Sequence, residues 1–456
     1  MERVAIIGEN SVEYVREILQ IWNLGNCAVL IDFRIPIYTA RKMMQEANVH
    51  KCYLQKSLLV DREQLAGFEI IEFEANTSEL RCLPEAIYTQ YRANQYWGEA
   101  VVLFSSGSTG KAKGVVLTHQ AIDTNANAIV DYMNLKRADR LLIVKSLTHV
   151  STLVGELLVC LKTHARVYIA PTRILPQTSL EILEQEKITT LCLNPSLLKL
   201  YTASQKHKHF PLLHLKAMYI SGSIADPHVL IEAEKLFEYT RILNVYGLTE
   251  AGPRVTAQTV DGDNVIGSVG KPIANVRIRI INELGEEVAP GNIGIVLVHT
   301  PSLFTRYLVD CSNEPRVING WLNTKDLGYV DDRKNLYIVG RSDNMTHIGS
   351  HNVYPESIES VIRSSGLIED CVVVSTVNKT YGNILLCLYV SESDTETELR
   401  DYCANRLATY EIPQQFISVD KITRTPNGKI DYSAMRERGY HNAGTKASSK
   451  HSHSGL

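Results

Sequence analysis

The chain has 456 residues, of which 45% are hydrophobic, and a formal net charge of −3. This length and composition predict a globular protein of roughly two to three domains, or one large domain with an appendage. The charge lacks the basic excess that binding to nucleic acid or an anionic membrane usually requires, and no run of about 18 apolar residues predicts a membrane span.

The cysteines are scattered along the chain, and their number, nine, is odd. The absence of any C-x-x-C pair argues against a disulfide framework and against a zinc site. We therefore expect small, buried apolar side chains in a reducing environment. Because the first residues also show no apolar leader with a cleavage site, we expect a cytoplasmic protein.

From residue 3 to about 250, short apolar runs alternate with amphipathic stretches, as in "VAIIG" followed by "SVEYVREILQIWNLG". This alternation predicts β-α units and largely parallel sheets. In the first amphipathic stretch Ser11 is a candidate helix cap. The apolar residues that follow it recur at helical spacing and predict a buried helix face: Val12, Val15, Ile18, Leu19 and Trp22.

The residue pattern changes near residue 267, where extended segments are joined by turns that contain Gly and Pro. This pattern predicts a β-rich subdomain over about 267–341. A second, smaller α/β unit is expected over 342–440. The small, polar residues 441–456 predict a disordered tail, although His451 and His453 in it leave metal binding as an alternative.

The stretch "SSGSTGKAKG" (residues 105–114) follows an apolar run and is rich in hydroxyls, glycines and lysines. It is not a Walker loop, because Ala112 stands where that motif has its second glycine. Backbone amides near the glycines, together with Lys111 and Lys113, nevertheless suit an oligophosphate. The alternative is a flexible Ser/Gly connection.

Four stretches in this order, "SSGSTGKAKGVVLTH", "NVYGLTEAG", "GWLNTKDLGYVDDRKNLYIVGRSDN" and "TRTPNGKID", resemble the adenylate-forming superfamily, which includes the acyl-CoA synthetases among the AMP-dependent synthetases and ligases. The resemblance covers nearly the whole chain. It implies an α/β fold with a large N-terminal domain (1–341) of layered β/α subdomains plus the β-rich subdomain, and a smaller, mobile C-terminal α+β domain (342–440).

The resemblance also implies an ATP site. Tyr246 would lie against adenine with Gly247 beside it, Thr249 would contact the α-phosphate, and Glu250 would hold Mg²⁺. The last role agrees with the preference of Mg²⁺ for one or two carboxylates plus phosphate oxygens; the alternative is an ordinary exposed glutamate at a helix start. The loop residues expected to bind the β- and γ-phosphates are Ser106, Gly107, Ser108, Thr109, Gly110 and Lys113.

Three further residues are implied around the domain boundary. Asp326 would accept hydrogen bonds from both ribose hydroxyls, which suits a carboxylate, unless it only forms a turn. Arg341 would contact the ribose and phosphates, and Asp343 would be the hinge about which the small domain rotates. A salt bridge within the linker is the alternative for this pair.

Lys429, in "PNGKID", would enter the site for adenylation, unless it is an exposed lysine in a turn. A carboxylate that attacks the α-phosphate brings two anions together, and a compact ammonium between them stabilises the charge of the transition state.

The acid pocket is less defined. His149 is a candidate for its lining, or a satisfied histidine at a strand end, and Ser221, Gly222 and Ser223 match the segment that meets nucleotide and acid. No carboxylate precedes Glu156 in the segment where amino-acid-activating relatives have one, and burying an unpaired ammonium is costly, so an amino acid substrate is disfavoured. Asp226, before Pro227, is expected to cap a helix.

The expected function is therefore an ATP- and Mg²⁺-dependent ligase that forms an acyl-adenylate and then an acyl thioester with CoA or a carrier-protein phosphopantetheine. Its partner would be a small carboxylic acid, and an acyl carrier protein is the partner only in the alternative in which the thiol is not that of CoA. The segment after the hinge departs from the family pattern at Asn344 and Ser357. This favours, as an alternative, a weakly active or non-catalytic partner of a biosynthetic complex.

Overall fold

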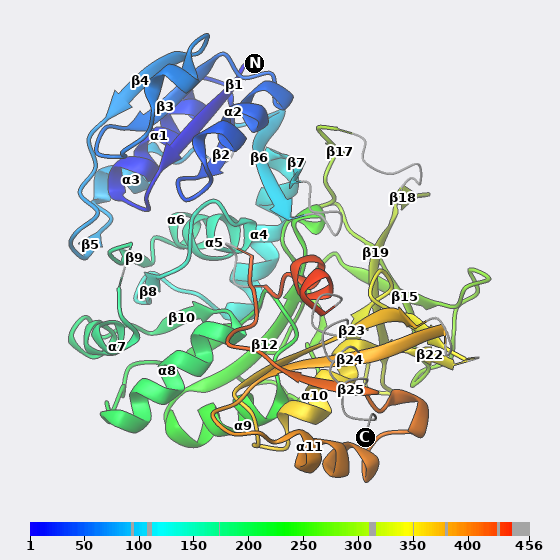
Figure 1. Ribbon diagram of the computed structural model, residues 1–456. Coiled ribbons are helices and arrows are strands. Elements are labelled where there is room, and N and C mark those ends of the chain that lie inside the picture. Colours follow the sequence, from blue (N-terminus) through cyan, green and yellow to red (C-terminus); the bar gives the residue numbers. More distant parts are fainter. Residues whose placement is uncertain are drawn as a thin grey trace.

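The fold was analysed in a computed structural model that describes residues 1–92, 95–106, 112–172, 174–309, 316–349, 351–378, 382–425 and 429–439, with backbone only at 105, 106, 112 and 382. Along the chain, two large sheets with the helices that connect their strands are followed by a β-rich unit and a small C-terminal domain (Figure 1).

The first large sheet is built from β-α units at the N-terminus. Its strands β1, β2, β3, β4 and β6 pair in parallel, and the edge strands β7 and β17 are antiparallel. The strands, in sheet order, are β17 (Arg306–Tyr307), β7 (Ala112–Thr118), β6 (Glu99–Ser106), β2 (Cys27–Asp32), β1 (Arg3–Gly8), β3 (Lys51–Gln55) and β4 (Glu69–Phe73).

Helices cover both faces of this sheet, because alternate residues of β1 are buried in two different cores. Helix α1 (Val12–Asn23) covers the inner face, α2 (Ile37–Glu46) covers the outer face, and α3 (Glu85–Gln90) follows them. The Ser11 hydroxyl caps α1 by accepting a hydrogen bond from the Tyr14 amide at 2.9 Å, and all five apolar residues expected on the buried face are buried. The predicted helix and its cap are confirmed.

The second large sheet contains the next run of β-α units. Strands β8 to β12 pair in parallel, and β5, β13 and β14 are antiparallel at the edges. In sheet order the strands are β14 (Lys271–Pro272), β13 (Arg254–Ala257), β12 (Arg241–Gly247), β11 (Ala217–Ile220), β10 (Thr190–Leu193), β8 (Arg140–Ile143), β9 (Arg166–Ile169) and β5 (Arg81–Cys82).

The helices of this part form two layers. Helix α4 (His119–Met133) and the helical stretch α5 (Val150–Thr152), π-helix η3 (Leu153–Leu158) and α6 (Val159–Thr163) lie between the two sheets, where one core joins both (Figure 1). Helices α7 (Pro176–Gln185), α8 (Pro195–His207) and α9 (Pro227–Leu236) cover the far face. Asp226 caps α9 by accepting from the His228 amide at 2.9 Å, as predicted.

The β-rich unit follows the second sheet and carries the last strands of the large domain. Strands β16 and β19 form its centre, with β15, β18 and β20 beside them. Their bounds are β15 (Arg277–Ile281), β16 (Gly294–His299), β18 (Val317–Ile318), β19 (Trp321–Val330) and β20 (Leu336–Arg341).

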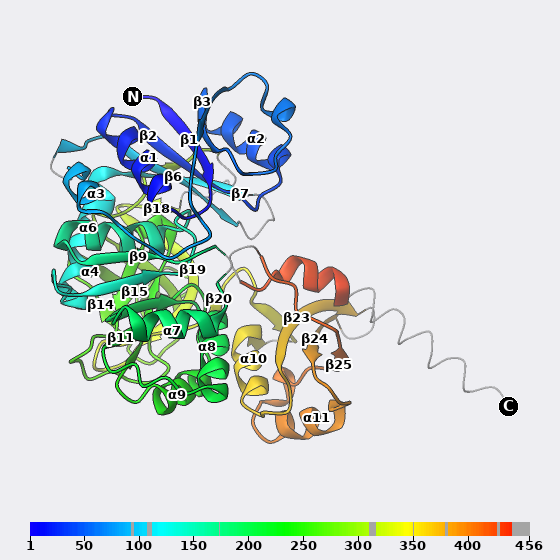
Figure 2. The same ribbon diagram turned by 90° about the vertical axis from the view of Figure 1, so that its left-hand side faces the viewer.

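The small domain places helices on both faces of the sheet β23 (Asp370–Asn378), β24 (Gly382–Val390) and β25 (Gln415–Ser418). Helices α10 (Pro355–Arg363) and α11 (Glu396–Ala404) cover one face and the helix over 432–439 covers the other. The hairpin β21 (Thr346–Ile348) and β22 (His351–Val353) precedes α10. This domain packs beside α8 (Figure 2), where Lys199 donates to the Glu369 carbonyl at 3.2 Å and Arg424 to the Ser196 hydroxyl at 3.2 Å.

The α/β fold class, with its large N-terminal and small C-terminal parts, is confirmed by this architecture and by the similar folds described below. The expected burial of the cysteines is wrong at one position among the eight that are described. Cys82 is exposed, because β5 is a two-residue strand that pairs only with β9. Among the described helices, none is long and apolar enough to cross a membrane.

A pH-dependent term in stability arises at His119, the first residue of α4, which packs against Trp22 and Tyr96. Burial lowers its pKa to about 4, and Asp123 opposes the shift only in part. In the unfolded chain the pKa is near 6.5, so between pH 6.5 and 4 the unfolded state binds a proton that the folded state excludes. Lowering the pH through this window therefore reduces the stability of the fold. At pH 5, this histidine alone lowers the free energy of unfolding by about 2 kcal/mol relative to neutral pH.

When the pH is lowered from 7.5 to 5, we expect the melting temperature of His119→Gln to fall by fewer degrees than that of the wild type. This comparison holds whatever the melting temperature of the variant is at pH 7.5. Differential scanning calorimetry of both proteins checks this, with His214→Gln at an exposed position as control. Equal pH slopes for His119→Gln and wild type would show that His119 does not titrate in this way.

Candidate functional site

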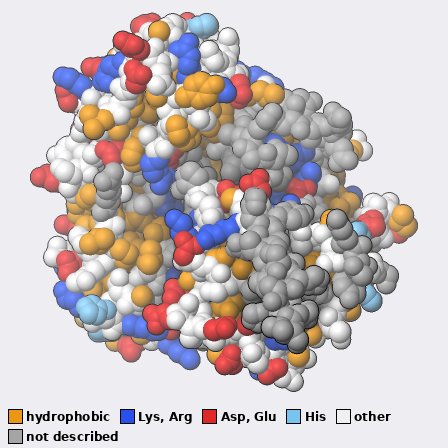
Figure 3. Space-filling model, viewed as in Figure 1, with side chains coloured by type: hydrophobic (Ala, Val, Ile, Leu, Met, Phe, Trp, Pro, Cys, Tyr) orange, Lys and Arg blue, Asp and Glu red, His pale blue; other side chains and the backbone are white. Residues whose placement is uncertain are grey.

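The site lies where the carboxyl ends of the parallel strands of both large sheets face each other. Ligands of open α/β sheets bind at this edge. Asp32 ends β2, His149 follows β8, Ser221 follows β11, and Tyr246 and Gly247 end β12. Figure 3 shows Lys and Arg side chains gathered around the middle of the face on which these strand ends lie.

Asp326 lies in the middle of β19 and is only 9% exposed, so it is not the turn residue of the alternative interpretation. Its Oδ2 accepts from the Tyr246 hydroxyl at 2.5 Å, and its Oδ1 accepts from Arg341 Nη1 at 3.0 Å. Burial raises the pKa of Asp326, and the Arg341 guanidinium opposes this rise. Three of the residues expected around the nucleoside are thereby joined in one network.

The hinge candidate Asp343 follows β20 and carries two ion pairs, to Lys325 at 3.3 Å and to Arg341 at 3.4 Å. The linker salt bridge named as its alternative is therefore present, and the hinge role stays a prediction. The atypical residues nearby have structural partners: Asn344 donates to Glu356 Oε1 at 2.7 Å, and the Ser357 hydroxyl to the Val339 carbonyl at 3.2 Å.

Glu250 lies in the 3₁₀ helix η4 (Thr249–Ala251) directly after β12, together with Thr249, and is 8% exposed. This burial excludes an ordinary surface glutamate. Its Oε1 accepts from the Tyr307 hydroxyl at 2.7 Å and from Arg316 Nη1 at 2.9 Å. Neither partner was predicted from the sequence, since neither belongs to a recognisable motif and each is brought to Glu250 only by the tertiary structure.

A carboxylate so enclosed has the chemistry of a Mg²⁺ ligand. The described residues contain no group of three or more His, Cys, Asp or Glu side chains arranged to hold a metal. Mg²⁺ commonly binds through one or two carboxylates, with phosphate oxygens and water completing its shell. Glu250 therefore fits a metal that arrives with a phosphate substrate, and does not fit a metal held by the protein alone.

Most of the predicted phosphate loop lies outside the described residues, namely Gly107, Ser108, Thr109 and Gly110, and only the backbone of Ser106 is described, at the end of β6. Lys113, on β7, is described: its ammonium lies 5.6 Å from the centre of the Tyr307 ring. Because Tyr307 also contacts Glu250, Lys113 lies on the same side of the site as that carboxylate.

Lys429 comes from the small domain yet lies within electrostatic reach of Asp326, Glu250 and Arg341. Its side chain keeps contact with solvent, but protein atoms surround the ammonium closely enough that desolvation lowers its pKa; the two carboxylates oppose this shift. Lys429 of the small domain is therefore close enough to Asp326 and Glu250 of the large domain to interact with their charges.

His149 precedes α5 and lies among charged side chains, with Lys145, Asp32, Arg34 and Lys429 all acting on it. Burial first, and then Lys145, lower the pKa of His149 to about 4, so the imidazole is neutral near pH 7. Lys145 forms a 2.9 Å ion pair with the fully buried Glu156 in η3. Because Glu156 is already paired, it is not a free carboxylate for a substrate ammonium.

The residues expected to meet the nucleotide and the acid, Ser221, Gly222 and Ser223, form the turn after β11. Gly222 has a φ of +106°, a conformation that favours glycine. Ile224, the next residue after this turn, is 45% exposed.

Gly247 is required by its surroundings, because a Cβ there would lie 1.9 Å from the Pro253 carbonyl oxygen. That oxygen accepts from the Leu248 amide at 2.9 Å, so it cannot move freely. We expect Gly247→Ala to cost about 1–3 kcal/mol of stability and to weaken ATP binding by displacing Tyr246 and Glu250. Thermal denaturation and calorimetric ATP titration measure both effects.

Gly439→Ala serves as the control, since its nearest neighbour would be the flexible end of Leu386 at 3.3 Å. Unchanged ATP affinity in Gly247→Ala would show that the turn after β12 does not position nucleotide-binding residues.

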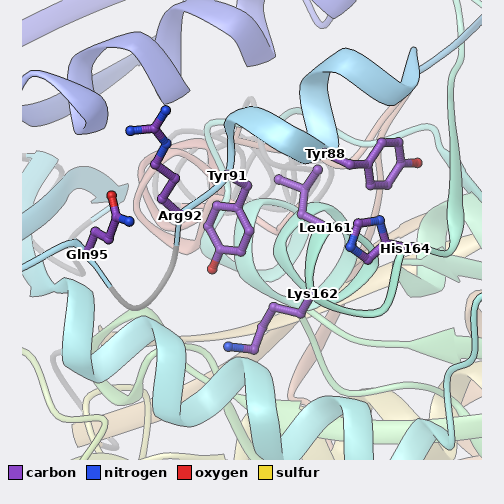
Figure 4. A pocket seen from close by; sticks show the side chains of 7 residues that line it. All are labelled: Tyr88, Tyr91, Arg92, Gln95, Leu161, Lys162 and His164. Atoms are coloured by element: carbon purple, nitrogen blue, oxygen red, sulfur yellow. The ribbon is translucent and has the colours of Figure 1, made fainter.

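A surface pocket of about 380 Å³ lies apart from this site, between α3 and the end of α6 (Figure 4). Its lining includes Tyr88, Lys162 and His164. His164 comes just before β9, so the pocket lies at the amino end of that parallel strand, the edge opposite to the site. No predicted site residue lines it.

Comparison with known proteins agrees with the geometry. The model of the AMP-binding enzyme family matches residues 1–308, and the model of the AMP-binding enzyme C-terminal domain matches 357–429. The chain is 24% identical to an indoleacetate–CoA ligase of Aromatoleum aromaticum, over 95% of this chain and 88% of that protein. It is 24% identical to a fatty acid–acyl-carrier-protein ligase of Streptomyces coeruleorubidus, over 96% of this chain and 86% of that protein.

The fold is similar to that of o-succinylbenzoate CoA synthetase of Bacillus subtilis, solved in complex with an acyl-adenylate intermediate, with a TM-score of 0.83 and 23% identity over 95% of this chain and 88% of that one. The chain belongs to the AMP-binding enzyme family and is an ATP-dependent acid–thiol ligase.

Proposed function

We propose that Lys429 and Glu250 are the central residues of adenylation, with Asp326 holding the ribose. The observation that supports this proposal is the approach of Lys429, from the small domain, to the carboxylates Asp326 and Glu250 of the large domain. Since the matched relatives are named as ligases, the non-catalytic alternative is set aside.

In the first half-reaction, a carboxylate oxygen of the acid attacks the α-phosphorus of ATP, and the bond between this phosphorus and the oxygen that leads to pyrophosphate breaks. Lys429 stabilises the negative charge that both anions bring together. Asp326 accepts from the ribose hydroxyls, Tyr246 lies against adenine, Thr249 contacts the α-phosphate, and Arg341 the ribose and phosphates. Lys113 and the loop that precedes it bind the departing pyrophosphate.

Mg²⁺, held by Glu250 and phosphate oxygens, would neutralise charge on the phosphates. Glu250 would supply one carboxylate oxygen to the metal from η4, which follows β12. In the second half-reaction a thiol sulfur attacks the acyl carbon, the carbon–oxygen bond to AMP breaks, and the thiol proton is lost to solvent. The thiol belongs to CoA or to a carrier-protein phosphopantetheine. Between the two half-reactions, rotation of the small domain about Asp343 would turn a different face of that domain toward the site.

The acid pocket lies around His149 and the turn Ser221–Ser223 in this proposal. Two described carboxylates lie in this region, Glu156, which is paired with Lys145, and Asp32, which is paired with Arg34 at 2.6 Å. Because both already have a cationic partner, they support acids other than α-amino acids. The charged neighbours of His149 give this region a polar character. A cytoplasmic location is also proposed, since seven of the eight described cysteines are buried and unpaired.

Pyrophosphate exchange into ATP across a panel of acids tests the proposal: short and long alkanoic, aromatic, hydroxylated and dicarboxylic acids, with α-amino acids as the group expected to fail. Mass spectrometry of the thioester formed with CoA or with a holo acyl carrier protein then identifies the acceptor. Exchange supported only by α-amino acids would contradict the proposed pocket, and absence of ATP·Mg²⁺ binding in calorimetry would contradict the nucleotide site.

A further inference from the structure

Arg316 is a partly buried cation of the site that no motif predicts. It precedes β18, and its side chain is only 11% exposed. Its Nη1 lies 2.9 Å from Glu250 Oε1 and also donates to the Tyr307 hydroxyl. Its Nη2 donates to the carbonyls of Thr324 at 3.1 Å and Asn323 at 3.4 Å, which belong to the strand that carries Asp326. The guanidinium is thereby held between the Glu250 and Asp326 parts of the site.

A Mg²⁺ ion that binds Oε1 of Glu250 would compete with Arg316 for that oxygen. Glu250 Oε1 already accepts from both Arg316 and Tyr307, so a metal that binds this oxygen must displace at least one donor. A buried guanidinium that loses its carboxylate needs another anion, since an unpaired buried charge is costly. One of its nitrogens, Nε, has no hydrogen-bond partner among the described residues even with Glu250 in place.

In the proposed function, the anion that enters this part of the site is the phosphate chain of ATP. Tyr307 lies between two cations, with Lys113 Nζ 5.6 Å and Arg316 Cζ 5.8 Å from its ring centre. Arg316 is thus on the side of the site where Lys113 and the preceding loop are expected to bind the β- and γ-phosphates. The planar fork of a guanidinium matches phosphate oxygens in pairs, which a lysine cannot do.

We propose that Arg316 is a phosphate-binding residue that exchanges partners: it pairs with Glu250 in the free enzyme, and it donates to the β- and γ-phosphates when Mg²⁺ takes that carboxylate. It then contacts the pyrophosphate group before release. This inference rests on the proposed function of Glu250 as the metal-binding carboxylate.

Calorimetric titration of the full chain with ATP·Mg²⁺, pyrophosphate·Mg²⁺ and AMP tests the proposal. We expect Arg316→Gln to weaken binding of ATP·Mg²⁺ and pyrophosphate·Mg²⁺ by about 10- to 100-fold, the effect of a lost charged hydrogen bond. AMP, which lacks the β- and γ-phosphates, should bind Arg316→Gln within about twofold of wild type, and this also verifies that the variant is folded. Arg316→Lys should show an intermediate loss, since it keeps the charge without the fork.

Arg306→Gln is the matched control, because Arg306 lies in β17, the strand that precedes Arg316 in the chain, but pairs with Glu99, away from the site. The proposal would be overturned if Arg316→Gln bound ATP·Mg²⁺ as tightly as wild type or more tightly. Arg316 would then only neutralise Glu250 until the metal binds. Equal losses for AMP and ATP would also overturn it, as they indicate a general structural role. If wild type bound neither nucleotide, the proposed function itself would be at fault.

Discussion

Lys429→Ala is expected to lower the rate of acid-dependent pyrophosphate exchange by roughly 10²- to 10³-fold, the usual effect of removing one preorganised electrostatic contact to a transition state. The reason is the location of its ammonium near Glu250, Asp326 and the expected α-phosphate, where desolvation strengthens its interaction with developing negative charge. ATP binding should change little, because the contact matters most when the second anion arrives.

Lys421→Ala is the matched control, since Lys421 is an exposed lysine of the same domain. Chemically synthesised acyl-adenylate should still be converted to thioester by Lys429→Ala, because the lysine acts only in the first half-reaction of the proposal. Exchange within about threefold of wild type would contradict the role of Lys429 as a transition-state contact, which should cost far more.

Asp326→Ala is expected to weaken ATP binding by roughly 10- to 100-fold, since hydrogen bonds to a charged group contribute about 1.5–3 kcal/mol. Its carboxylate is oriented by the Tyr246 hydroxyl and by Arg341, so both oxygens are held in place before the ribose arrives. Removing it also leaves the Tyr246 hydroxyl without its acceptor. Calorimetric titration with ATP measures the loss, and Asp332→Ala, at an exposed position of the same unit, is the control.

A comparison with 2′-deoxyATP separates ribose binding from structural damage. Wild type should bind 2′-deoxyATP more weakly than ATP, whereas Asp326→Ala should hardly distinguish the two, because the acceptor for the hydroxyl is gone. Equal discrimination in both proteins would show that Asp326 does not accept from the 2′-hydroxyl.

Sequence patterns predicted those elements well whose stabilising contacts join residues only a few positions apart. Ser11 caps α1 and Asp226 caps α9 because a short polar side chain before an apolar helical repeat can satisfy the free amides of the first turn within a few residues. Alternating apolar runs predicted parallel strands, and their carboxyl ends carry His149, Ser221 and Tyr246 as that fold class requires. The burial of Cys82 was wrong because an edge strand has one side open, which a count of cysteines does not reveal.

The sequence by itself determined the α/β class, the resemblance to adenylate-forming enzymes and the candidates Glu250, Asp326 and Lys429, because these depend on residue types at fixed short spacings. Only the tertiary structure decided which groups surround them. Arg316 reaches Glu250 across 66 residues of chain, and Asp326 reaches Tyr246 across 80. Such pairings follow from how strands of separate units pack, and the energy of a buried charge depends on the partner that packing supplies.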